Sequence, residues 1–218
     1  MKKILIFTDS LGLPRAYPEV TLFEETWPEL FRRNYPQLEL HKVCLGGATT
    51  KEILGQIDYH KLFNPDLVIV QVGIVDCAPR FLTRKELLFM RLLPFSKYIL
   101  KSLNNKNVKR IRGVTYTSKK QFKSNIEKIN KSFDCKVVFI GILPASFHYE
   151  NQLPGVIKNI TDYNHLLSQY EFLDTNGFPQ EGIMSDYHHL NPLGNQILFE
   201  SLKTKLNILY PQLNYNNE

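Results

Sequence analysis

The stretch ILIFTDS, residues 4–10, decides the fold. Its first four residues form a continuous apolar run, which stops abruptly at Thr8, Asp9 and Ser10. Such runs are typical of strands buried on both faces, as in a parallel sheet covered by helices. The stretch therefore predicts a first strand, with Asp9 and Ser10 just beyond its carboxyl end.

Strand-like and helix-like segments alternate along the rest of the chain. Strands are expected over residues 38–45, 66–72, 136–140 and 172–173, and helices over 26–34, 49–57, 154–170 and from 192 onward. This alternation predicts an α/β sandwich with a mainly parallel sheet. A length of 218 residues fits one domain spanning 1–218.

Three short polar sequences follow predicted strands. They are Asp9-Ser10, Gly46-Gly47 and the Gly-Ile-Val-Asp stretch of residues 73–76. Reactive groups in such sheets collect at the carboxyl ends of the strands, so we expect all three sequences at one rim. This convergence is the first indication of a site.

A serine needs a base and a group that orients the base before it can act as a nucleophile. The late segment SDYHHLNP, residues 185–192, offers both. Asp186 and His189 lie three residues apart, close enough for the carboxylate to hold the imidazole. The adjacent His188 is an alternative base on these grounds alone.

In order and composition these blocks resemble the SGNH or GDSL-type hydrolases over nearly the whole chain. Asp9-Ser10-Leu11 resembles the nucleophile block, LGGATT at 45–50 the glycine block, and DYHHLNPLG at 186–194 the acid–base block. The resemblance implies a flavodoxin-like three-layer α/β/α sandwich. It also implies Ser10 as nucleophile, His189 rather than His188 as base, Asp186 as its partner, and oxyanion donors at the Ser10 and Gly47 N–H groups.

Two positions depart from the family pattern. Thr8 stands where Gly usually precedes Asp-Ser, and Val75 stands where the third block usually has an oxyanion-binding Asn. Losing one such donor typically costs about 10²–10³ in rate. Arg80 is our preferred substitute because it follows the third block closely, and Arg15 is a second candidate. Asp9 and Asp76 are expected to support the site, Asp76 in a structural role.

The middle of the chain is strongly basic. Residues 80–123 hold thirteen Lys or Arg and one acid, for a net charge of +12, whereas the remainder sums to −6. Segment 81–123 predicts an amphipathic helical cap or insertion, broken into two helices at Pro94. Alternatives to a solvated face are peripheral membrane contact or attraction of an anionic substrate. Nucleic-acid binding is not expected, because no recognised motif accompanies the charge.

Other features point to a cytoplasmic protein, with contact at the inner membrane face as an option. The N-terminal apolar run of four residues is shorter than the roughly 7–15 of a secretory signal. Cys44, Cys77 and Cys135 are isolated from one another and predict neither disulfides nor a zinc site. No metal or cofactor is expected.

The expected function is that of a serine esterase that removes O-acyl groups, in particular O-acetyl, from a cell-surface saccharide or its precursor. This substrate is an analogy with the family. One rival is an O-acyltransferase using the same Ser10, His189 and Asp186. The other is a catalytically weak binding protein, for which Val75 is the main indication.

Overall fold

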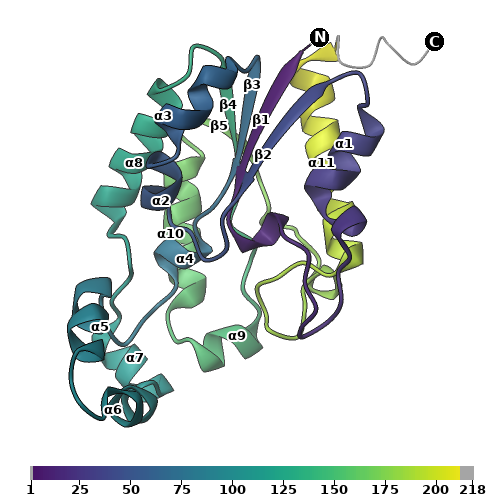
Figure 1. Cartoon of the computed structure of the whole chain (residues 1–218). Coiled ribbons are helices and arrows are strands. Elements are labelled where there is room, and N and C mark those ends of the chain that lie inside the picture. Colours follow the sequence, from purple (N-terminus) through teal and green to yellow (C-terminus); the bar gives the residue numbers. More distant parts are fainter. Residues whose placement is uncertain (1, 212–218) are drawn as a thin grey trace.

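A five-stranded parallel sheet lies between two layers of helices in the computed structural model, which describes residues 2–211 (Figure 1). The strand order is β2-β1-β3-β4-β5. The strands are β1 (Lys3–Thr8), β2 (Glu39–Cys44), β3 (Leu67–Gln71), β4 (Lys136–Ile140) and β5 (Glu171–Leu173). The predicted three-layer, mainly parallel α/β sandwich is therefore confirmed, with the strand order of flavodoxin-like folds.

The opening apolar run is buried on both faces of the sheet. Ile4 and Ile6 belong to one core and Leu5 and Phe7 to the other, all with side chains 0–1% exposed. Alternate residues of a strand point to opposite faces, so a strand covered on both sides must be apolar throughout. This explains why ILIF shows no polar alternation.

Helices α1 (Trp27–Asn34) and α11 (Pro192–Leu209) cover one face of the sheet. Proline stands in the first turn of each helix, where its missing N–H leaves no hydrogen bond unmade. The Asn191 side chain caps α11 by accepting a bond from the N–H of Gly194 at 2.9 Å. Helix α11 thus begins directly after the segment that carries His189.

The other face is covered by α2 (Thr50–Leu54), α3 (Ile57–His60), α8 (Lys119–Lys131) and α10 (Val156–Leu167). In α8, Phe122, Ile126 and Ile129 are fully buried. Residues 119–123, which we assigned to the basic insertion, therefore form the first turn of a core helix. Their lysines lie on its outer side, and the charge count alone does not separate them from the insertion.

Three helices, α5 (Arg84–Arg91), α6 (Ser96–Leu103) and α7 (Lys106–Arg112), extend from one end of the sandwich (Figure 1). The break expected at Pro94 is present, between α5 and α6. A second break was not expected; there the Asn105 side chain accepts bonds from the N–H groups of Asn107 and Val108 and so starts α7. No residue of these three helices is buried.

Two short helices, α4 (Ile74–Cys77) and α9 (Phe147–Gln152), follow β3 and β4 near the carboxyl edge of the sheet. Since β1 lies between β2 and β3, the chain reverses its winding direction there, and open α/β sheets bind ligands at such a point. Among residues 2–211, no helix is long and apolar enough to cross a membrane.

Candidate active site

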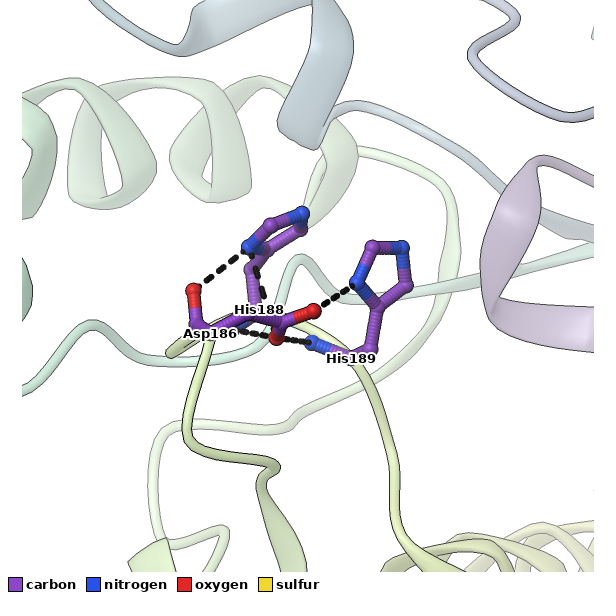
Figure 2. A group of neighbouring side chains, drawn as sticks. All are labelled: Asp186, His188 and His189. Atoms are coloured by element: carbon purple, nitrogen blue, oxygen red, sulfur yellow. Dashed lines mark hydrogen bonds and ion pairs between the residues drawn. The ribbon is translucent and has the colours of Figure 1, made fainter. Parts of the chain in front are cut away.

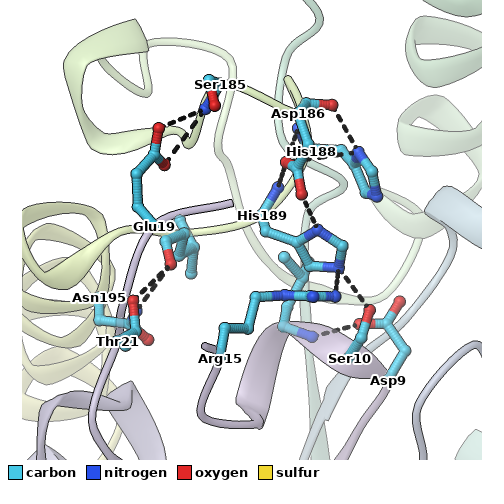
Figure 3. A network of polar contacts seen from close by, with 12 residues as sticks. Asp9, Ser10, Arg15, Glu19, Thr21, Ser185, Asp186, His188, His189 and Asn195 are labelled. Atoms are coloured by element: carbon cyan, nitrogen blue, oxygen red, sulfur yellow. Dashed lines mark hydrogen bonds and ion pairs between the residues drawn. The ribbon is translucent and has the colours of Figure 1, made fainter. Parts of the chain in front are cut away.

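Ser10 begins a single turn of 3₁₀ helix directly after β1. The turn is held by Asp9, whose Oδ1 accepts the N–H of Leu11 at 2.9 Å. The Ser10 Oγ lies 2.9 Å from Nε2 of His189, although 179 residues separate the two in the chain (Figure 3). The nucleophile and the base expected from the sequence are thus in hydrogen-bond contact.

Asp186 holds His189 through both backbone and side chain. Its Oδ2 lies 2.7 Å from His189 Nδ1, and its Oδ1 accepts the N–H groups of His188 and His189 at 3.2 and 3.1 Å. The intervening Tyr187 adopts φ +68°, which turns the chain back tightly enough for these contacts. An ionised carboxylate can only accept, so Nδ1 carries the proton and Nε2 presents a lone pair to Ser10.

The charge on Asp186 is stabilised in this arrangement. Partial burial works against ionisation, but the hydrogen bond from His189 and the neighbouring His188 and His189 rings hold the pKa of Asp186 well below its ordinary value. The carboxylate therefore stays charged at neutral pH and can stabilise an imidazolium at His189.

The N–H groups of Ser10 and Gly47 are available as oxyanion donors. Within residues 2–211, neither donates any of the backbone hydrogen bonds found in turns and loops. Gly47 adopts φ +70°, a conformation that favours glycine, and both residues line the same pocket. Val75 lines this pocket too, so an apolar side chain does occupy the third-block position.

Arg15 reaches His189, the base expected from the sequence. Its Nη2 contacts Nε2 of His189, the same atom that faces Ser10 (Figure 3). The Arg15 backbone pairs with Thr21, and Glu19 in the same loop accepts the N–H of Ser185 at 3.0 Å. These bonds tie the Arg15 loop to the segment that carries Asp186 and His189.

Arg80 lies on the pocket wall at the base of the α5–α7 insertion. Its backbone N–H donates to the carbonyl of Val114 at 2.7 Å, and its guanidinium lies 4.9 Å from the centre of the Tyr116 ring. Arg84 lies over the same ring at 5.0 Å but is also paired with Glu52. Arg80 has no ion-pair partner in the part of the chain that the structure describes.

These side chains surround an open cavity of about 590 Å³. It is lined by Ser10, Leu13, Pro14, Arg15, Gly46, Gly47, Ile74, Val75, Arg80, Tyr116, Tyr149, His188 and His189. The volume falls within the roughly 300–1,000 Å³ of small-molecule sites. No residue between 81 and 115 lines it. The expected helical cap thus lies beside the pocket rather than over it, because its two ends pair at Arg80 and Val114 and direct the helices away.

Asp9 and Asp76 are fully buried beneath the site. Burial raises the pKa of Asp9 to about 7 and that of Asp76 to about 6. Asp76 accepts the backbone N–H of Thr50 at 2.9 Å and its hydroxyl at 2.8 Å. It therefore fastens the start of α2 to the loop after β3, and it has no ion pair with Arg80.

Asp186, His188 and His189 together could hold a metal ion (Figure 2). One ligand atom from each lies within 4.8 Å of the others. However, the Asp186 carboxylate and His189 Nδ1 already bind each other at 2.7 Å, and His188 Nδ1 lies 2.8 Å from the Asp186 carbonyl. A cation would have to break these bonds, so the donor set fits an acid–base pair better than a metal centre.

Comparison with known proteins gives matches in structure alone. No family model matches the sequence, and no curated protein matches it either. A lipase/acylhydrolase from Enterococcus faecalis is similar in structure, with a TM-score of 0.66, 16% identity, and coverage of 96% of this chain and 97% of that one. The acetyl xylan esterase AlAXEase has a TM-score of 0.58, 16% identity, and coverage of 93% and 98%.

Further solved structures agree. TesA gives a TM-score of 0.63 at 16% identity, with coverage of 95% and 99%. A lipolytic protein of the G-D-S-L family from Veillonella parvula gives 0.59 at 12% identity, with coverage of 94% and 97%. The chain has the fold of the G-D-S-L lipolytic proteins. The fold that the sequence blocks implied is therefore confirmed over nearly the whole length.

Several residues of this pocket were not expected from the sequence. Tyr116 and Tyr149 form part of its wall, and His188 stacks on the Tyr149 ring at 5.7 Å between centroids. Burial raises the pKa of Tyr149 to about 12, so its hydroxyl stays protonated. Neither tyrosine lies in a recognisable motif. Tyr116 follows the α5–α7 insertion and Tyr149 lies in α9, and no sequence signal marks either position.

Proposed function

We propose that the protein is a serine ester hydrolase that removes O-acyl groups, acetyl in particular, from a saccharide or a glycan precursor. The observation that carries the proposal is the continuous contact from Ser10 Oγ to His189 (2.9 Å) and on to Asp186 (2.7 Å). The proposal is also supported by the structural neighbours, which include a lipase/acylhydrolase and an acetyl xylan esterase, both named as ester hydrolases.

The reaction proceeds in two steps. His189 Nε2 takes the proton of Ser10 as Oγ forms a bond to the ester carbonyl carbon, and the carbonyl oxygen gains negative charge beside the Ser10 and Gly47 N–H groups. The bond to the alcohol oxygen then breaks, and His189 returns the proton to the departing alcohol. Water, deprotonated by His189, then forms a bond to the acyl carbon, the bond from that carbon to Ser10 Oγ breaks, and His189 returns the proton to Oγ as the acid leaves. Asp186 keeps the imidazole in the required tautomer throughout.

The shape of the pocket supports a small, partly polar substrate. Two aromatic rings, Tyr116 and Tyr149, stand on its wall, and its volume of about 590 Å³ is large enough for a sugar ring carrying an ester. The faces of the two tyrosine rings can pack against the apolar face of a sugar ring, while the tyrosine hydroxyls remain available for hydrogen bonds. Residues 81–115 leave the pocket open to water, which favours hydrolysis over acyl transfer to a second alcohol.

A fluorophosphonate probe tests the proposal directly. The full chain should be labelled at Ser10, and labelling should be lost in Ser10→Ala while the circular dichroism spectrum stays unchanged. Release of acetate from a peracetylated sugar should depend on Ser10 in the same way. Labelling of wild type and Ser10→Ala to the same extent would contradict both the hydrolase and the transferase hypotheses.

A further inference from the structure

We propose that the pocket selects esters that carry an anionic group, a carboxylate or a phosphate, which Arg15 and Arg80 bind beside Ser10. This inference rests on the proposed hydrolase function and narrows its substrate class. It comes from the charge of the pocket and from the unmet hydrogen bonds of its two arginines.

The pocket wall carries two positively charged side chains. Arg15 and Arg80 both line it, and no carboxylate does. In the described chain, neither guanidinium forms an ion pair with an acid, and the Nε of each is buried without a hydrogen-bond partner. Both side chains are half-buried, so a guanidinium without an ion-pair partner there is less well solvated than one in open water. An anionic ligand in the pocket would supply the ion-pair partner that neither guanidinium has within the described chain.

Arginine is suited to this role by geometry. Its planar fork donates two parallel bonds to carboxylate or phosphate oxygens. Arg80 is oriented by its contact with Tyr116 and by the backbone bond to Val114, and Arg15 by the pairing of its loop with Thr21. The Arg80 side chain and the Arg15 backbone are thus held before a ligand arrives, which lowers the entropy lost on binding.

The contact of Arg15 with His189 gives the anion a second effect. Nε2 of His189 has one lone pair in the ring plane, and both Arg15 Nη2 and Ser10 Oγ face it. An anion that draws Arg15 away leaves this lone pair to the serine hydroxyl. Substrate charge would therefore improve the base as well as increase affinity.

Matched ester pairs test the inference, with kcat/KM as the measurement. On the acyl side, 4-nitrophenyl hemisuccinate is compared with 4-nitrophenyl butyrate; on the alcohol side, acetylglycerol phosphate with acetylglycerol. We expect the wild type to prefer the anionic member of at least one pair by tenfold or more, and the pair that shows the preference locates the anion. Ratios near one for both pairs would overturn the inference.

Variants assign the preference to residues. Arg80→Met and Arg15→Met should each lower the anionic-to-neutral ratio at least fivefold. Arg84→Met is the matched control, because Arg84 lies over the same Tyr116 ring but is paired with Glu52; its ratio should stay within twofold of wild type. A ratio that survives in both Arg80→Met and Arg15→Met contradicts the assignment.

A binding measurement separates this inference from the proposed function. Calorimetric titration of Ser10→Ala with monomethyl succinate or glycerol phosphate should give a dissociation constant that rises at least fivefold when Arg80→Met is added. Hydrolysis of neutral esters without such binding refutes the anion site alone. Absence of Ser10-dependent labelling refutes the hydrolase.

A different observation carries a second proposal: we infer that α5–α7 docks on an anionic lipid surface. Leu92, Phe95 and Ile111 are 78%, 77% and 81% exposed, and Leu88, Phe89 and Tyr98 in the same segment are 66%, 64% and 77% exposed. A segment that exposes so many large apolar side chains is typical of an interaction site. Residues 84–112 also hold nine Lys or Arg against a single acid, Glu86.

The positive charge of residues 84–112 distinguishes among the partners that could cover their apolar side chains. Two copies of a segment with such a positive excess repel each other, whereas a bilayer containing anionic lipids attracts it and accepts the apolar side chains between its headgroups. Nucleic acid would satisfy the charge but leave Leu92 and Phe95 in water.

Sedimentation with vesicles tests the docking. The protein should bind vesicles of equal phosphatidylcholine and phosphatidylglycerol in 0.1 M NaCl, and bind pure phosphatidylcholine at least tenfold more weakly. The variant Leu92→Ser/Phe95→Ser should lose most of this binding while keeping its fluorophosphonate labelling. Absence of binding to the anionic vesicles, or a dimer that Leu92→Ser/Phe95→Ser abolishes, would overturn the proposal.

Discussion

The carboxyl edge of the sheet and the α5–α7 insertion differ in which side chains they bury and which they leave exposed. At the sheet edge, Asp76 is buried and bonded to Thr50, and Ser10 is in contact with His189, so polar groups far apart in sequence find partners there. In the insertion, apolar side chains such as Leu92 and Phe95 stand in solvent. The first region thus satisfies most of its polar groups within this chain, whereas the second exposes the apolar side chains on which the proposed lipid contact rests.

The largest effect is expected at the sheet edge, from Asp186→Asn. The amide N–H₂ of asparagine can donate to Nδ1 of His189, which moves the ring proton to Nε2 and removes the lone pair that faces Ser10. The neutral amide also cannot stabilise an imidazolium, so kcat should fall by about 10⁴. Steady-state hydrolysis of a 4-nitrophenyl ester measures this. A loss below tenfold would mean that the Asp186–His189 contact contributes little to the reaction.

Core helix α8 and the insertion provide a direct contrast in stability. Phe122 is fully buried beside the Tyr163 ring, at 4.8 Å between centroids. Phe122→Ala should therefore lower the free energy of unfolding by about 3–5 kcal/mol. Urea denaturation followed by circular dichroism measures the change. A loss under about 1 kcal/mol would place α8 with the insertion rather than with the sandwich.

Asp9 makes stability depend on pH. Its pKa is raised from 3.8 to about 7 by burial, so the folded state holds the proton more tightly than the unfolded state does. The group's unfavourable contribution is absent below pH 4, grows as pH rises towards 7 by at most about 1.4 kcal/mol per pH unit, and is constant above that.

Asp9→Asn keeps an acceptor for the Leu11 N–H but carries no charge. Its unfolding free energy should fall less than that of the wild type as pH rises from 5 to 7, because Asp76, with a pKa of about 6, titrates in both proteins whereas Asp9 titrates in the wild type alone. Denaturation at several pH values checks this. Parallel curves for the two proteins would show that Asp9 does not titrate in this range.

The smallest effect on stability is expected in the insertion. Leu92→Ser/Phe95→Ser removes two large apolar side chains that are mostly exposed, so the free energy of unfolding should change by less than about 0.5 kcal/mol. The same urea titration as for Phe122→Ala gives the comparison on one scale. A loss above about 2 kcal/mol would mean that these side chains pack within the chain, and it would remove the contrast between the two regions.

Local sequence patterns predicted the strands and brought Ser10 together with the Asp186–His189 segment, and the resemblance to a known family chose His189 rather than His188 as the expected base. The reason is local: a strand buried on both faces must read as an uninterrupted apolar run, as in ILIF, and an Asp and His three residues apart can meet within one turn. Parallel strands then bring their carboxyl ends to one edge, which places residue 10 near residue 189 without further information.

Tertiary structure alone decided which side chains surround those three residues. Whether Arg15, Arg80, Tyr116 and Tyr149 face the same cavity depends on how loops of irregular conformation pack, and no periodicity records that. The same holds for the basic middle segment, whose uniform charge conceals a boundary: residues from 119 onward join the core, and 84–112 do not. Burial made that division, because charge is tolerated on the outer face of a core helix as readily as on an exposed one.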